Sequence, residues 1–154
     1  MTIVSAICNS FKQEILIEGH NFTNGTDSFK LSLYSSDSAT LSKSTTAYTA
    51  PADGTADPTN TYEVTSTSSG YTTGGNALTS TTPVLSTDTA CCKFANTSFT
   101  SASFTARGCL IYNSTNSNKA VCVVNFGADK TVTSGTFTIE FPAQTATNAI
   151  IEIA

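Results

Sequence analysis

The feature that most constrains the fold is a strict alternation of apolar and polar side chains in two separate stretches. Residues 29–34 read FKLSLY, and residues 136–141 read TFTIEF. Successive side chains of a β-strand point to opposite faces, so this period of two predicts strands with one buried and one solvated face. Pro142 ends the second of these strands. The chain therefore reads first of all as a β protein.

Two apolar runs around a short polar linker predict a β-hairpin at residues 103–112 and 119–126. In the second run, alternate residues from Ala120 to Phe126 share one face, and Val121 and Val123 take the other. A strand that is apolar on both faces has to be covered on both. We expect a sandwich core on one side of it and an N-terminal helix on the other, with a turn at 127–130 before the next strand.

The amino-terminal region predicts one short helix over about residues 5–18. Ile7, Phe11 and Ile15 recur at helical spacing, with Leu16 beside them on the same face, and Gly19 stands where a helix ends. Lys12, Gln13 and Glu14 are then expected to face solvent or a partner.

Residues 35–60 have no periodicity, and Pro51, Gly54 and Pro58 interrupt them. A segment of this length without its own structure is long for a loop in a compact domain. We expect an irregular loop or arm that orders against neighbouring proteins. Further short strands are expected at 62–64, near 78 and 84–85, at 90–95 and at 151–153. The whole chain, residues 1–154, is thus predicted to be mainly β: one antiparallel β-sandwich or barrel-like domain with one short N-terminal helix.

Charge and hydropathy bear on the possible partners. The net charge is -4, and the seven basic residues, of which only Arg107 is an arginine, are scattered along the chain. Nucleic-acid binding usually needs a clustered basic face, so we expect no nucleic-acid partner. No apolar run approaches the length of a membrane span, and residues 1–5 do not read as a signal peptide. We expect no membrane partner, and folding in a cytoplasm.

The cysteines do not predict a disulfide framework, because their number is odd and their spacing irregular. They are Cys8, Cys91, Cys92, Cys109 and Cys122. We expect them to be small, reduced, buried residues, and no Cys-x-x-Cys pair indicates zinc.

Residues for catalysis are also few. The single histidine, His20, follows Gly19 in a polar stretch and is expected at the surface or in a turn. The glycines at 70, 74 and 75 lack the Gly-Lys-Ser/Thr of a phosphate loop and predict turns with positive φ. The sequence therefore predicts no catalytic residue, no cofactor-binding residue and no metal ligand, and the chain is not expected to be an enzyme.

A series of short motifs resembles small structural proteins of tailed-bacteriophage virions, in particular the capsid decoration, or cement, proteins. The motifs are FKQE at 11–14, GYTTGG at 70–75, FTARG at 104–108, LIY at 110–112, KAV at 119–121, FG at 126–127 and FTI at 137–139. They span most of the chain except residues 35–60. The sequence departs from the pattern in having Phe99 and no tryptophan before the Ala-Arg-Gly segment, and in its adjacent Cys91 and Cys92.

This resemblance implies a non-catalytic protein on the capsid surface of a virion assembled in the bacterial host cytoplasm. Its partners would be the major capsid protein, bound across capsomer seams, and further copies of itself in a dimer or trimer. One alternative is a tail or head–tail connector protein. A second is a carbohydrate-binding or adhesin-like sandwich, which needs exposed aromatic residues. The candidates for that platform are Tyr34, Tyr48, Tyr62, Tyr71 and Tyr112, whose spacing indicates no common patch.

Overall fold

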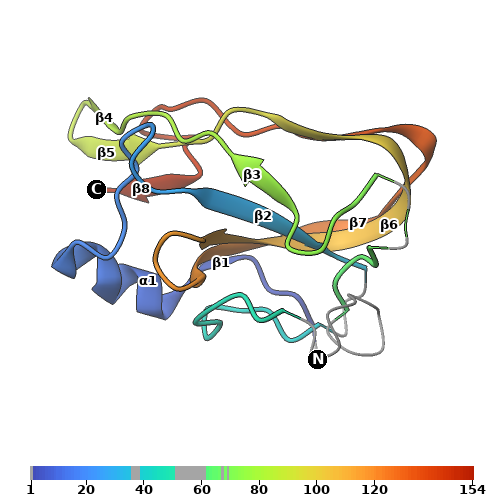
Figure 1. The fold of residues 1–154 in the computed structure, drawn as a ribbon. Coiled ribbons are helices and arrows are strands. Elements are labelled where there is room, and N and C mark those ends of the chain that lie inside the picture. Colours follow the sequence, from blue (N-terminus) through green and yellow to red (C-terminus); the bar gives the residue numbers. More distant parts are fainter. Residues whose placement is uncertain (1, 36–38, 51–61, 67, 69) are drawn as a thin grey trace.

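Two antiparallel sheets form the body of the protein in the computed structural model, which describes residues 2–35, 39–50, 62–66, 68 and 70–154 (Figure 1). The five-stranded sheet has the order β1 (Ala6–Ile7), β7 (Lys119–Ile139), β6 (Thr97–Asn113), β2 (Phe29–Tyr34) and β3 (Asn76–Leu78). The three-stranded sheet has the order β4 (Val84–Ser86), β5 (Thr89–Cys92) and β8 (Ile151–Ile153). One helix, α1 (Asn9–Glu14), continues into a 3₁₀ turn, η1 (Ile15–Ile17). The predicted fold class, a mainly β, sandwich-like domain with a short N-terminal helix, is confirmed.

The hairpin of β6 and β7 belongs to both layers. Near its tip it lies between β1 and β2 in the five-stranded sheet, and further from the tip both strands bend over to lie above that sheet (Figure 1). Pairing runs from Asn113 with Lys119 at the tip to Thr97 with Ile139. Four register shifts interrupt it, and such bulges bend and twist a strand.

The turn expected at residues 127–130 is one of these bulges. Ala106 pairs with Lys130 and Gly108 with Asn125, so that residues 126–129 stand opposite Arg107 alone. Gly127, with φ +77°, supplies the left-handed conformation there. The prediction of a turn is wrong because β6 is long enough to pair with β7 on both sides of the bulge, and β7 continues to Ile139.

Strand β2 is buried on both faces, which corrects the expected wet face. Ser32 and Tyr34 are buried along with the leucines between and before them. Residues 62–64 lie along the edge of β2: Ser35 N–H donates to the Tyr62 carbonyl at 2.7 Å, and Val64 N–H donates to the Leu33 carbonyl at 2.8 Å. The strand expected at 62–64 is therefore a single bridge between Tyr34 and Glu63.

The helix is shorter than the expected range of 5–18. Ala6 and Ile7 pair with Val123 and Cys122 at the edge of β7, because that edge offers backbone partners that a helix would leave unused. Phe11 is buried as predicted, whereas Leu16 is 83% exposed. The chain tightens into the 3₁₀ turn at Ile15, which rotates Leu16 away from the core.

Part of the expected arm is packed on the domain itself. Leu41 and Tyr48 are buried, and the carbonyls of Leu41 and Thr46 accept hydrogen bonds from the N–H groups of Val4 and Ala120, each at 2.9 Å. Residues 39–50 thus lie against the chain before β1 and against the start of β7. Residues 36–38 and 51–60 of the predicted arm lie outside the described residues.

Between the two layers lies an aromatic core. Phe29 and Phe94 pack with ring centroids 5.4 Å apart, and Phe99 and Phe104 meet edge to face at 5.9 Å. Aromatic pairs in these geometries contribute about 1 kcal/mol each beyond the burial of their area. These rings come from β2 (Phe29), from the segment between β5 and β6 (Phe94) and from β6 (Phe99 and Phe104). The core thus connects residues near the three-stranded sheet to the five-stranded sheet.

Candidate functional site

A buried carboxyl group lies at the centre of a cluster of tyrosines. Glu63 is fully buried, and its Oε1 accepts hydrogen bonds from Tyr71 Oη and Gly74 N–H, both at 2.7 Å. Its Oε2 accepts one from Tyr48 Oη at 3.0 Å. Tyr112 stacks on Tyr48 with centroids 4.5 Å apart and donates to the Gly74 carbonyl at 2.8 Å. The cluster ties three irregular segments to β2 and β6.

The chemistry of this cluster is that of a structural element. Burial raises the pKa of the Glu63 carboxyl, and the hydrogen bonds from Tyr71, Gly74 and Tyr48 lower it in part. Burial also raises the pKa of Tyr48 and Tyr71, so that both phenols remain protonated donors at neutral pH. Every described contact of the carboxyl is internal.

The glycines of residues 70–75 shape the turn that closes the cluster. Gly70, Gly74 and Gly75 all have positive φ, which confirms the prediction of structural turns. Gly75 also approaches β2 closely, since a Cβ there would lie 1.7 Å from the Leu31 carbonyl oxygen. The turn can form only with glycine at this position.

His20 belongs to a second buried polar cluster, which corrects the expectation of a surface histidine. Its Nε2 lies 2.8 Å from Glu14 Oε2, and its Nδ1 lies 3.2 Å from Asn113 Nδ2. Asn113 Oδ1 accepts the N–H groups of Thr115 and Asn116, which directs its amide nitrogen toward His20 and fixes the histidine proton on Nε2. Through these contacts His20 connects α1 to the end of β6.

The N-terminal helix presents fewer groups to a partner than expected. Lys12 and Gln13 are exposed, whereas Glu14 holds His20 and lies 3.5 Å from Lys119 Nζ. The sequence gives no sign of this, because His20 and Lys119 are brought to Glu14 by the tertiary fold.

All five cysteines are buried and unbonded to one another, as predicted for small apolar residues. Burial raises the pKa of Cys8 to about 11 and those of Cys92 and Cys109 to about 12. Thiols of this kind are poor nucleophiles at neutral pH.

Two further observations concern the described residues alone. They contain no group of three or more His, Cys, Asp and Glu side chains placed to hold a metal ion. Their helices are too short and too polar for any of them to cross a membrane.

The strongest candidate for a functional surface is one end of the molecule. Of the six large apolar side chains exposed in the described part of the chain, five lie on η1, β4 and β8: Leu16, Ile17, Val84, Leu85 and Ile153. Figure 1 shows α1, β4, β8 and the carboxyl terminus at this same end. A groove of about 370 Å³ runs between α1–η1 and β8. We call these five residues the apolar end.

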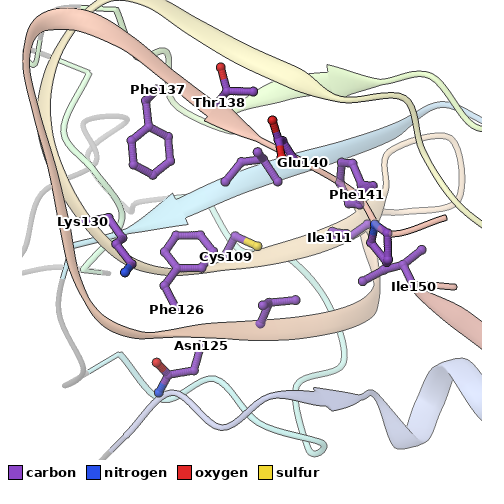
Figure 2. A pocket seen from close by; sticks show the side chains of 13 residues that line it. Cys109, Ile111, Asn125, Phe126, Lys130, Phe137, Thr138, Glu140, Phe141 and Ile150 are labelled. Atoms are coloured by element: carbon purple, nitrogen blue, oxygen red, sulfur yellow. The ribbon is translucent and has the colours of Figure 1, made fainter. Parts of the chain in front are cut away.

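A second hollow lies between the two halves of the bent hairpin. This hairpin pocket, of about 510 Å³, is lined by Cys109 and Ile111 of β6, by Val124, Phe137 and Ile139 of β7, and by Phe141. Figure 2 shows Phe126 and Lys130 on one side of it and Glu140 and Ile150 on the other. Both its size and its apolar lining are typical of binding pockets.

The five candidate tyrosines do not form a surface platform. Tyr34, Tyr48, Tyr71 and Tyr112 are buried. Sequence reasoning expected no common patch, and it missed that these residues converge inside the protein. Their separation along the chain carries no signal for that convergence.

Comparisons with protein families, with curated proteins and with solved structures find no match for this chain.

Proposed function

We propose that this chain is a non-catalytic structural protein of a tailed-bacteriophage virion, and specifically a decoration protein that binds the outer capsid across capsomer seams. The proposal takes its direction from the series of motifs between residues 11 and 139 that resembles such proteins. A protein of this kind adds contact free energy to the assembled capsid only, and so shifts the equilibrium toward the intact particle. The major capsid protein is then its partner.

The observation that carries the proposal is the apolar end. Leu16 is 83% exposed and Leu85 74% exposed, although leucine side chains of a monomer are generally covered. Exposed apolar side chains that gather at one end of a protein favour binding to other proteins there. Burial of each leucine in an interface contributes about 2 kcal/mol.

The titratable clusters fit the same proposal. The carboxyl of Glu63 and the imidazole of His20 are both enclosed and hydrogen-bonded by neighbouring side chains. Each therefore acts in holding loops on the sandwich, which a protein that works by binding requires.

The test is the amount of this protein in purified particles. We expect a copy number proportional to that of the major capsid protein, measured by quantitative mass spectrometry. Replacing Leu16 and Leu85 together by aspartate removes apolar area from the interface and adds charge to it. The occupancy of empty capsids by added protein should then fall about tenfold or more, as measured by co-sedimentation.

A matched control carries the same two charges elsewhere. Ser44 and Ala128 are exposed and lie outside the apolar end, so that the double aspartate variant at these positions should bind capsids like the wild type. If each particle contains only the few copies that form one ring, the protein is a tail or head–tail connector component instead. Particles that lack the protein altogether would refute the proposal.

A further inference from the structure

The outer half of β7 has a long free edge. Residues 131–139 pair with β6 on one side, and β1, the other neighbour of β7, reaches only Val123 and Cys122. Among the described residues, no backbone hydrogen bond joins this outer edge to another segment. An exposed strand edge presents unpaired N–H and C=O groups that another strand can bind.

This edge has little protection against pairing. Residues 131–139 read TVTSGTFTI and contain neither a charge nor a proline, the two residue classes that most often block an edge. One bulge at Ser134, with φ +46°, divides the strand into two runs. Apart from this bulge, residues 131–139 are part of the continuous strand β7.

The edge lies beside the hairpin pocket. Phe137 and Ile139 point from β7 into the pocket, where they meet Phe126 and Val124 of the inner half of the same strand. These side chains are only partly buried, so that the core of the sandwich is open along this side (Figure 2). An additional strand on the edge of β7 would cover them.

The charges at the two ends of the edge select the partner. Lys130 precedes the free edge and Glu140 follows it, and both are exposed. Asp129, next to Lys130, is already 3.5 Å from Arg107. When two copies of this edge pair antiparallel, the Lys130 end of each copy lies beside the Glu140 end of the other. The edge is thus complementary to itself about a two-fold axis.

We propose that residues 131–139 of β7 form a homodimer interface, in which two copies pair antiparallel across a two-fold axis and their two hairpin pockets face each other. Three features that lie side by side support this dimer: the unpaired edge of β7, the open apolar pocket beside it, and the opposite charges at the two ends of the edge. The dimer joins the upper layers of two sandwiches into one continuous sheet. It depends on nothing in the proposed capsid function and leaves the apolar end of each copy free for a different partner.

The experiment is a charge exchange on the purified full chain, with the dimer dissociation constant measured by sedimentation equilibrium. Lys130→Glu and Glu140→Lys each place like charges together at both ends of the interface, and each should raise the dissociation constant about tenfold. The double variant, Lys130→Glu with Glu140→Lys, restores opposite charges. It should return the constant to within about threefold of the wild type.

Two further measurements localise the contact. Lys43→Glu changes an exposed lysine on the loop that covers the other side of β7 and should leave the dissociation constant unchanged. Hydrogen exchange of the amides in residues 131–139 should slow as the protein concentration rises, and the Lys130→Glu variant should need a higher concentration for the same protection.

The proposal is overturned if the wild-type chain remains monomeric in sedimentation equilibrium at a protein concentration on the order of 100 μM. A double variant as weak as the single ones would also overturn it, as would a dimer that Leu16→Asp dissociates while the amides of β7 stay unprotected. Failure of the capsid test leaves this result untouched, since it uses no particle.

Discussion

At the scale of single residues, Glu63 joins three irregular segments through its side-chain hydrogen bonds. It holds Tyr48, Tyr71 and the Gly74 amide at once, each from a part of the chain with little regular structure. If the carboxyl is removed, the donors that it held are left without hydrogen bonds inside the protein. Glu63→Ala should therefore be strongly destabilising, by about 3 kcal/mol or more.

The ionisation of Glu63 predicts a pH dependence of stability. Burial raises the pKa of this carboxyl above its ordinary value of 4.5, so that folding favours the protonated form. Its contribution is complete below that ordinary value and is lost as the pH rises through the raised pKa. Glu63→Gln keeps the hydrogen-bonding shape without the ionisation. In urea titrations, the unfolding free energy of the wild type minus that of the Gln variant should decrease from pH 4 upward. An increase with pH would show that the hydrogen bonds outweigh burial.

At the scale of elements, the irregular segments are as important as the strands. The turn at residues 70–75 and the segment 39–50 cover faces of β2 and β7 that would otherwise be exposed to solvent. The bend of the β6–β7 hairpin depends on bulges in the same way, since regular pairing would keep both strands in one layer. Glycine has a different part in each of these features.

Two glycines with positive φ allow a matched comparison. Gly75→Ala brings a Cβ within 1.7 Å of the Leu31 carbonyl oxygen, whereas a Cβ at Gly127 meets nothing within 4 Å. Both alanines suffer the left-handed backbone, which costs about 1 kcal/mol. We expect Gly127→Ala to lose about that amount and Gly75→Ala to lose at least about 3 kcal/mol, measured by chemical denaturation. Equal losses would mean that the turn can move away from β2.

At the scale of the whole molecule, the layers are not independent units. Strands β6 and β7 pair within the five-stranded sheet and bend over it, and the aromatic residues Phe29, Phe94 and Phe99 belong to one buried core (Figure 1). Loss of structure in either half of the hairpin would expose this shared core.

This arrangement predicts a single cooperative unfolding transition for the full chain. Scanning calorimetry should give a calorimetric enthalpy equal to the van't Hoff enthalpy, under reducing conditions and at a protein concentration below that of dimerisation. Intrinsic tyrosine fluorescence and far-ultraviolet circular dichroism should follow the same curve. Two separated transitions would mean that the hairpin does not couple the layers.

Local patterns were sufficient for the elements themselves. The period of two at 29–34 and the paired apolar runs at 103–112 and 119–126 predicted the strands and the hairpin, and the pattern around Phe11 predicted a helix although not its bounds, because each depends on neighbours a few residues apart. The glycines at 70–75 likewise predicted their turn from backbone preference alone.

Contacts between distant residues decided the rest. His20 is buried beside Asn113, which is 93 positions away along the chain, and both faces of β2 are buried although its sequence alternates. The hairpin pocket and the free edge of β7 arise from the direction in which a bulged hairpin bends. Periodicity records which side of a strand is apolar, but only packing in three dimensions determines what covers that side and which edge is left open.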